Sequence, residues 1–92
     1  MKIVINTRYG GFGINSKWRA KNCKEGCYED RQKCRKCAKL IRAIEEKEER
    51  IDNDFSELTV VEIPNEATDY QILEYDGYEA LLYVLDGKIR YV

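Results

Sequence analysis

Four cysteines between residues 23 and 37 are the side chains of this sequence best suited to chemistry. They are spaced Cys23-x3-Cys27-x6-Cys34-x2-Cys37. Zinc accepts four thiolates in a tetrahedron with Zn–S distances of about 2.3 Å, and clustered cysteines in a reducing cytosol are more often metal ligands than disulfides. We therefore predict that these four cysteines bind one structural Zn²⁺. Two disulfides or four unligated thiols are the alternative interpretation.

The same spacing constrains the backbone that would hold the metal. On one continuous helix, Cys23 and Cys37 would stand about 21 Å apart, since each residue rises 1.5 Å. The chain must therefore reverse between the two pairs, and we expect it to do so near Gly26. Cys23 and Cys27 would end a short helix or form a loose knuckle, and Cys34 and Cys37 would lie near the start of the next helix. Because four thiolates fill every coordination position, the site leaves none for water or substrate.

Catalytic chemistry has little support in the remaining residues. The sequence contains no His, which removes the commonest general base, and its serines are Ser16 and Ser56. Carboxylates such as Asp86 and Glu79 could pair, but solvated charges in a hairpin explain them equally well. We expect the protein not to be an enzyme.

The net charge of −1 hides a strongly divided chain of 92 residues. Residues 1–42 hold twelve Lys and Arg against three acids, whereas residues 43–92 hold four against fourteen. Residues 17–42 alone carry ten Lys and Arg around the predicted zinc, which is typical of a phosphate-binding face. A zinc-containing nucleic-acid-binding protein is therefore one candidate. These cations could equally offset the charge of four thiolates bound to one Zn²⁺.

A protein-binding module is the other candidate, because five of the seven tyrosines lie among acids in the last 23 residues. Tyrosines and acids on a sheet or its turns can form a binding surface for a basic partner. The alternative is that the tyrosine side chains alternate along the strands, so that half of them face the core. No apolar run approaches the roughly 18–20 residues of a membrane helix, so we expect a cytoplasmic protein with no membrane contact.

The elements that must position these residues follow from periodicity and turn signals. A glycine-rich turn with Phe12 buried should follow a first strand, and Asn15 or Ser16 should cap a short helix. One helix is expected over residues 31–51, and Asp-Gly pairs predict hairpins, although residues 78–83 could form a helical turn. We predict one α+β domain over residues 1–92: an antiparallel sheet of about four or five strands packed on two helices clasped by a zinc site of four cysteines. The expected strands are residues 2–7, 58–63, 70–75, 81–85 and 88–92.

Two sequence blocks carry a resemblance to a known group. Lys2-Ile3-Val4-Ile5-Asn6 with Tyr9-Gly10-Gly11-Phe12-Gly13, and Val61-Glu62-Ile63-Pro64 with Glu74-Tyr75-Asp76-Gly77-Tyr78-Glu79, resemble small phage and prophage proteins of Gram-positive bacteria. The likeness covers about residues 1–16 and 57–80, and the cysteines lie between, in a part of that group that is variable and often lacks them.

Some small, charged phage proteins of this kind are anti-CRISPR proteins against type II-A systems, and this sequence looks like a zinc-containing member of that class. The resemblance implies stoichiometric binding to Cas9, alone or as its guide-RNA complex, in the cytoplasm of the bacterial host, with target-DNA loading blocked. Acidic residues of the second half would then face basic Cas9 channels. The candidate contacts are Glu45, Glu46, Glu48, Glu49, Asp69, Glu74, Asp76 and Tyr78.

Overall fold

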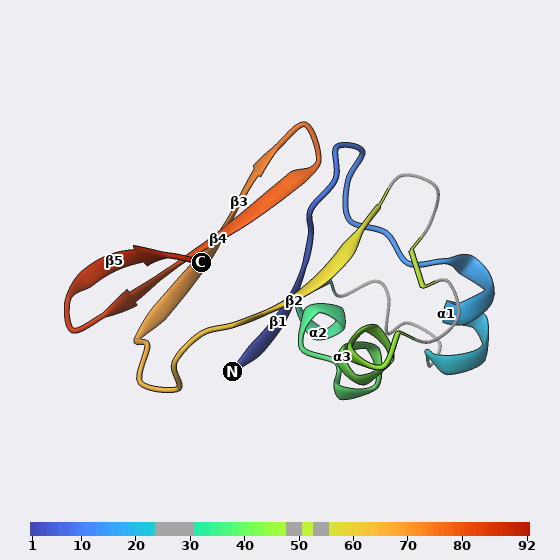
Figure 1. Ribbon diagram of the computed structural model, residues 1–92, viewed down its shortest axis with the longest axis horizontal. Coiled ribbons are helices and arrows are strands. Elements are labelled where there is room, and N and C mark those ends of the chain that lie inside the picture. Colours follow the sequence, from blue (N-terminus) through green and yellow to red (C-terminus); the bar gives the residue numbers. More distant parts are fainter. Residues whose placement is uncertain (24–30, 48–50, 53–55) are drawn as a thin grey trace.

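The computed structural model describes residues 1–23, 31–47, 51–52 and 56–92 (Figure 1). These residues form an α+β fold, which confirms the predicted class. The expected single sheet is wrong, because the strands form two separate antiparallel sheets, β1–β2 and β3–β4–β5. In chain order the elements are β1 (Lys2–Asn6), α1 (Ser16–Asn22), α2 (Arg31–Arg35), α3 (Ala38–Glu45), β2 (Leu58–Glu62), β3 (Asp69–Tyr75), β4 (Tyr78–Leu85) and β5 (Lys88–Tyr91).

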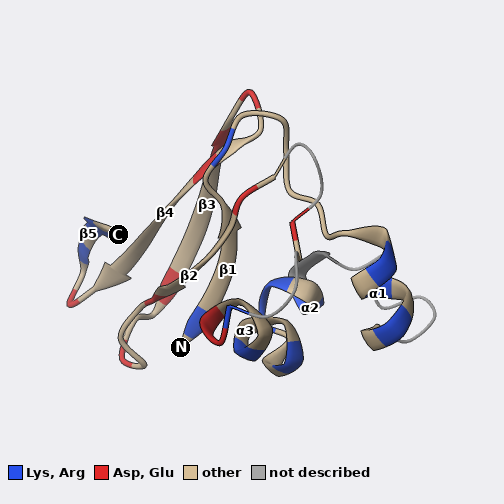
Figure 2. Ribbon diagram, turned by 45° about the vertical axis from the view of Figure 1, so that its right-hand side comes forward, with Lys and Arg blue, Asp and Glu red and all other residues tan. Residues whose placement is uncertain are grey.

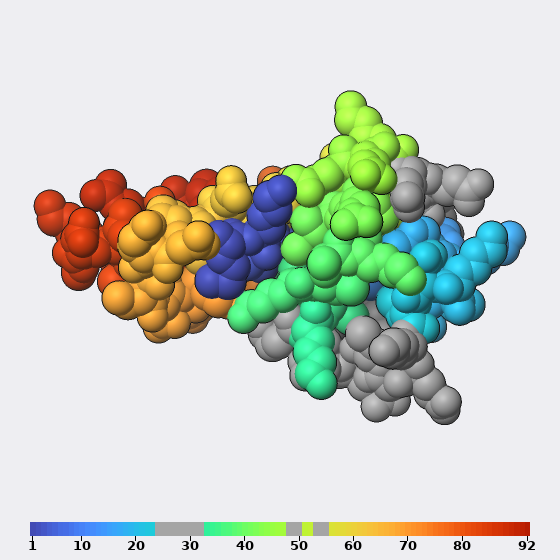
Figure 3. All heavy atoms as spheres, turned by 90° about the horizontal axis from the view of Figure 1, so that it is seen from below, coloured from blue at the N-terminus to red at the C-terminus, as the bar shows by residue number. Residues whose placement is uncertain are grey.

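The β1–β2 pair lies between the helices and the three-stranded sheet, and strand β1 is buried on both faces. Ile3 and Ile5 pack with Ile63 and Leu81 against the larger sheet, whereas Val4 packs on the helical side. A strand buried on both faces needs a continuous apolar run instead of alternation, which accounts for Ile-Val-Ile. The helices therefore cover β1 and β2, not the larger sheet. Figure 3 shows the N-terminal residues between the C-terminal strands and the helices.

The helix expected over residues 31–51 is interrupted. Cys37 has an extended backbone (φ −65°, ψ 117°) between α2 and α3, and α3 ends before Lys47, which is left-handed at φ 51°. Basic residues precede acidic ones along this segment, which opposes the helix dipole and leaves the helix dependent on packing. Ile51 lies beyond α3 and is buried, and its carbonyl accepts a hydrogen bond from the Asn15 N–H.

Both Asp-Gly pairs form tight hairpin turns, as predicted. Asp76 and Gly77 have φ values of 50° and 87°, and Asp86 and Gly87 have values of 53° and 75°. Positive φ at both central residues is what a type I′ turn requires, and its twist matches that of the flanking strands. The alternative of a helical turn over residues 78–83 is wrong, because they lie in β4.

The predicted start of the first helix is confirmed at Asn15. The Oδ1 of Asn15 accepts hydrogen bonds from the backbone N–H groups of Lys17 and Trp18, at 2.9 and 3.3 Å. This cap satisfies two of the donors that a helix leaves unpaired at its N-terminus. In the described part of the chain, no helix has the length and apolarity needed to span a bilayer.

Candidate functional site

Three of the four predicted zinc ligands lie in or beside the helices and around one core cluster. Cys23 directly follows α1 as its C-cap, which agrees with the first of the two arrangements expected for it, and Cys34 lies within α2. Cys37 follows α2, and its N–H donates to the carbonyl of Cys34 at 3.2 Å. Cys34 is buried inside the cluster formed by the helices, β1 and β2, and the other two cysteines pack against it. Cys27 and the expected reversal near Gly26 lie outside the described residues.

The described cysteines are not in disulfides. Within residues 1–23, 31–47, 51–52 and 56–92, no group of three or more His, Cys, Asp or Glu side chains is arranged to hold a metal ion. The donor chemistry nevertheless suits zinc, because soft thiolates are among the ligands that Zn²⁺ prefers. The zinc site stays a prediction that depends on Cys27.

A buried ion pair joins α2 to β4. Arg35 Nη1 donates to Glu79 Oε1 at 2.8 Å, and Nη2 donates to Oε2 at 2.6 Å; each side chain is only 7% exposed. Arg35 Nη1 also donates to the carbonyl of Val4 at 3.0 Å, and its guanidinium lies 4.5 Å from the centre of the Phe12 ring. The Asn6 N–H donates to Glu79 Oε1 at 2.8 Å. One carboxylate thus connects the helices, β1 and the larger sheet.

Sequence reasoning missed this pair. It treated Glu79 as a solvated hairpin charge or as a carboxylate partner of Asp86. A signal was present, because Glu79 and Leu81 are two residues apart in one strand and therefore lie on the same face. That face turns towards β1, where Leu81 is buried in the core.

The segment that follows β1 packs on the turn between β3 and β4. Asn6 is fully buried, and its Nδ2 donates to the carbonyl of Gly77 at 2.7 Å. The Gly10 N–H donates to the carbonyl of Asp76 at 3.0 Å. A Cβ atom at Gly77 would lie 2.1 Å from the backbone N of Gly11, so the two turns meet backbone to backbone. This contact requires glycine at Gly77, which also has φ 87°.

The basic half of the sequence is displayed on the helices (Figure 2). Trp18, which could have stacked on a nucleic-acid base, is instead buried in the core at 8% exposure. The helical face therefore offers charge without an aromatic platform from this residue. Its exposed cations in the described residues are Lys17, Lys21, Lys33, Lys36, Lys39 and Arg42.

The acidic residues at the end of α3 have cations around them. Lys2 Nζ donates to Glu45 Oε2 at 2.8 Å, and this hydrogen bond, followed by the attraction between the two charges, raises the pKa of the Lys2 amine. Glu45 and Glu46 share the wall of a hollow of about 650 Å³ with Lys2, Lys36 and Arg42. Candidate contacts Glu48 and Glu49 lie outside the described residues.

The candidate contacts of the C-terminal strands lie on different parts of the larger sheet. Asp69 begins β3, Asp76 lies in the β3–β4 turn and Tyr78 begins β4; all three are exposed. Glu74 is also exposed, and its Oε1 accepts a hydrogen bond from the Gly77 N–H at 3.0 Å. Asp69, Glu74, Asp76 and Tyr78 thus belong to the larger sheet and its turn, whereas Glu45 and Glu46 lie at the end of α3.

Alternation divides the tyrosines of this sheet. Tyr70 and Tyr83 are opposite each other in the ladder and pack against the core, whereas Tyr75, Tyr78 and Tyr91 are exposed. The exposed ones belong to the face turned away from β1, which we call the outer face. By strand register it consists of Asp69, Gln71, Leu73 and Tyr75 of β3, Tyr78, Ala80, Leu82 and Val84 of β4, and Ile89 and Tyr91 of β5.

Comparison of the chain with protein-family models, with curated proteins and with solved structures found no match.

Proposed function

We propose that this protein is a phage-derived anti-CRISPR protein that binds type II-A Cas9 stoichiometrically and blocks loading of target DNA. The observation that carries the proposal is the contact between the two blocks that resemble phage proteins. Gly10 and Gly11 pack against the turn at Gly77, and the Asn6 N–H donates to Glu79. The resemblance therefore concerns one connected substructure and not two separate strings of residues.

Binding alone is sufficient for this mode of inhibition. Cas9 holds guide and target strands in positively charged channels, and it must open the target duplex beside them. A compact protein that carries exposed carboxylates can occupy such a channel in place of the DNA phosphates. The exposed Asp69, Asp76 and Asp86 of the C-terminal strands supply charge of the required sign. We infer that the protein acts without catalysis.

A structural zinc belongs to the same proposal. Cys23, Cys27, Cys34 and Cys37 would hold it, and the shared core cluster of the three described cysteines supports their proximity. A bound Zn²⁺ would contribute its binding free energy to folding, which matters most for a chain of this size. Because Cys34 precedes Arg35 in α2, ligation would also hold in place the helix that carries the buried ion pair.

Co-elution tests the proposal directly. The full chain is mixed with Cas9, with and without guide RNA, and separated by size-exclusion chromatography, and the metal content of the eluted protein is measured. We expect a complex with Cas9 that contains one zinc per inhibitor. Absence of a complex at high molar excess with several Cas9 orthologues would refute the proposal, and a complex without zinc would refute only the metal site.

The second candidate, nucleic-acid binding, is favoured by the exposed cations of the helices. It predicts that the protein alone shifts labelled DNA or RNA, with an affinity that falls steeply as salt rises. Charge of this kind supports only sequence-independent binding. A strong shift of free nucleic acid without any Cas9 complex would favour this candidate.

A further inference from the structure

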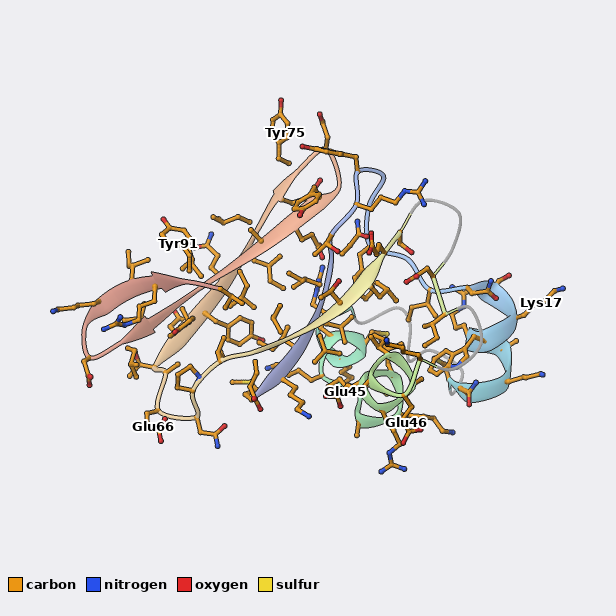
Figure 4. The ribbon with its side chains drawn as sticks, in the orientation of Figure 1. Lys17, Glu45, Glu46, Glu66, Tyr75 and Tyr91 are labelled. Carbon is orange, nitrogen blue, oxygen red and sulfur yellow. The ribbon has the colours of Figure 1, made fainter. Side chains whose placement is uncertain are left out.

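The outer face exposes large apolar side chains. Tyr75 is 73% exposed, Tyr91 71% and Ile89 63%. Figure 4 shows Tyr75 and Tyr91 pointing away from the helical end of the molecule. Tyr9 extends the aromatic surface, because its ring lies 5.3 Å from that of Tyr78. Contiguous apolar surface of this kind is uncommon on monomeric proteins and marks interaction sites.

The charged residues of this face and of the two turns that border β4 are acidic. Among the ten residues of the outer face, Asp69 is the only Asp, Glu, Lys or Arg. Asp76 and Asp86 lie in the turns at the two ends of β4. The two cations of β5, Lys88 and Arg90, are opposite Leu85 and Tyr83 in the ladder and so belong to the other face. An approaching molecule meets tyrosines flanked by carboxylates.

We propose that the outer face is the docking surface for a positively charged protein surface. Lys and Arg of the partner would pair with Asp69, Asp76 and Asp86 and lie over the rings of Tyr75 and Tyr91, since aromatic faces attract cations. This inference rests on the proposed function, with Cas9 as the partner, and it identifies which of the two acidic regions makes the contact.

Charge complementarity selects this occupant over the others. Nucleic-acid phosphates would be repelled by the carboxylates, and a second copy docked through the same face would bring two acidic borders together. The acidic end of α3 is a weaker candidate, because Glu45 is already paired with Lys2 and the adjoining hollow also contains Lys36 and Arg42. The outer face has no such internal compensation among the described residues that form it.

The test compares two faces of the same strands. One variant carries Tyr75→Ser and Tyr91→Ser on the outer face, and its matched control carries Lys88→Ser and Arg90→Ser on the opposite face of β5. Affinity for the Cas9–guide complex is measured by biolayer interferometry, after thermal melting has shown that both variants are folded. Buried tyrosine anchors are typical hot spots, so we expect the outer-face variant to bind at least about tenfold more weakly. The control should bind within about twofold of the wild type, or more tightly, because the removed cations repel a basic partner.

A third variant isolates the charge. Asp76→Asn and Asp86→Asn keep both turns, because Asn-Gly is the preferred type I′ sequence, but remove two carboxylates. Association should slow by about threefold or more and depend less on salt, since charges at the edge of an interface act mainly on the association rate.

The outcomes separate the two proposals. If the tyrosine variant binds Cas9 as tightly as the wild type does, the proposed docking surface is refuted and the proposed function is not. A wild type that neither binds nor inhibits Cas9 would refute the proposed function and, with it, this contact. Light scattering could also show that the wild-type protein is a dimer and the tyrosine variant a monomer. In that case a second copy of the chain covers the outer face, and the inference is overturned.

Discussion

Replacing Glu79 by Gln is expected to destabilise the protein by about 3 kcal/mol, because it leaves Arg35 buried without a counter-charge. Glu79 accepts three hydrogen bonds, two from the guanidinium and one from the Asn6 N–H. Gln keeps one acceptor oxygen but turns an amide N–H group towards a donor. Removal of one partner of a buried ion pair costs about 3–5 kcal/mol, and the lower end applies here because Gln preserves the shape and some hydrogen bonds.

The loss is large compared with the total stability of a small domain, which is about 5–15 kcal/mol. It corresponds to a fall in Tm of about 12–24 °C for a chain of this size. Urea unfolding followed by circular dichroism should show a lower midpoint with an unchanged slope. The matched control, Glu66→Gln at an exposed loop position, should stay within about 0.5 kcal/mol of the wild type.

A double variant separates the cost of an unpaired charge from the value of the pair. Arg35→Met combined with Glu79→Leu removes both charges, and we expect it to be more stable than Glu79→Gln alone, because no buried charge is left uncompensated. If Glu79→Gln unfolds within about 1 kcal/mol of the wild type, the ion pair is not the connection between the layers that the structure indicates.

The remaining predictions concern the turns, the surface pair and the cysteines. Gly77→Ala should lower the free energy of unfolding in urea by about 3 kcal/mol or more, because its Cβ would meet the backbone of Gly11. Gly87→Ala, which has open space around it, should cost only the roughly 1–2 kcal/mol of a left-handed backbone. Equal costs would contradict the close contact at Gly77. Glu45→Gln should leave the midpoint of urea unfolding close to that of the wild type, since the bond of Glu45 to Lys2 is solvent-exposed, and a clear fall in the midpoint would contradict this. Cys34→Ser should lower both the zinc content and Tm, and a variant with full zinc and wild-type melting would contradict the predicted site.

Local signals predicted the elements of this fold well. Asn15 begins a helix because its side chain can accept hydrogen bonds from the first turn, and the two Asp-Gly pairs form hairpins because both residues tolerate positive φ. The alternation hypothesis for the tyrosines is also confirmed, since Tyr70 and Tyr83 face the core. Each of these outcomes depends on residues close together in the chain.

The features of the fold that the sequence did not indicate depend on contacts between residues that are far apart in the chain. The break at Cys37 interrupts an apolar stripe that continues at helical spacing, so periodicity alone predicts one helix. The ion pair joins residues 35 and 79, and nothing local to Arg35 distinguishes it from the exposed cations around it. The division into two sheets likewise follows from β1 packing between layers, which no single segment encodes.

An order-of-addition cleavage assay tests the central claim most directly. The protein is added to Cas9–guide complex either before or after the target DNA, and cleavage is followed as the inhibitor concentration rises. Inhibition of DNA loading predicts that cleavage stops as the inhibitor approaches equimolarity with Cas9 when it is added first, and that it continues when the DNA is bound beforehand. Cleavage that proceeds unchanged at large molar excess in both orders would contradict the account.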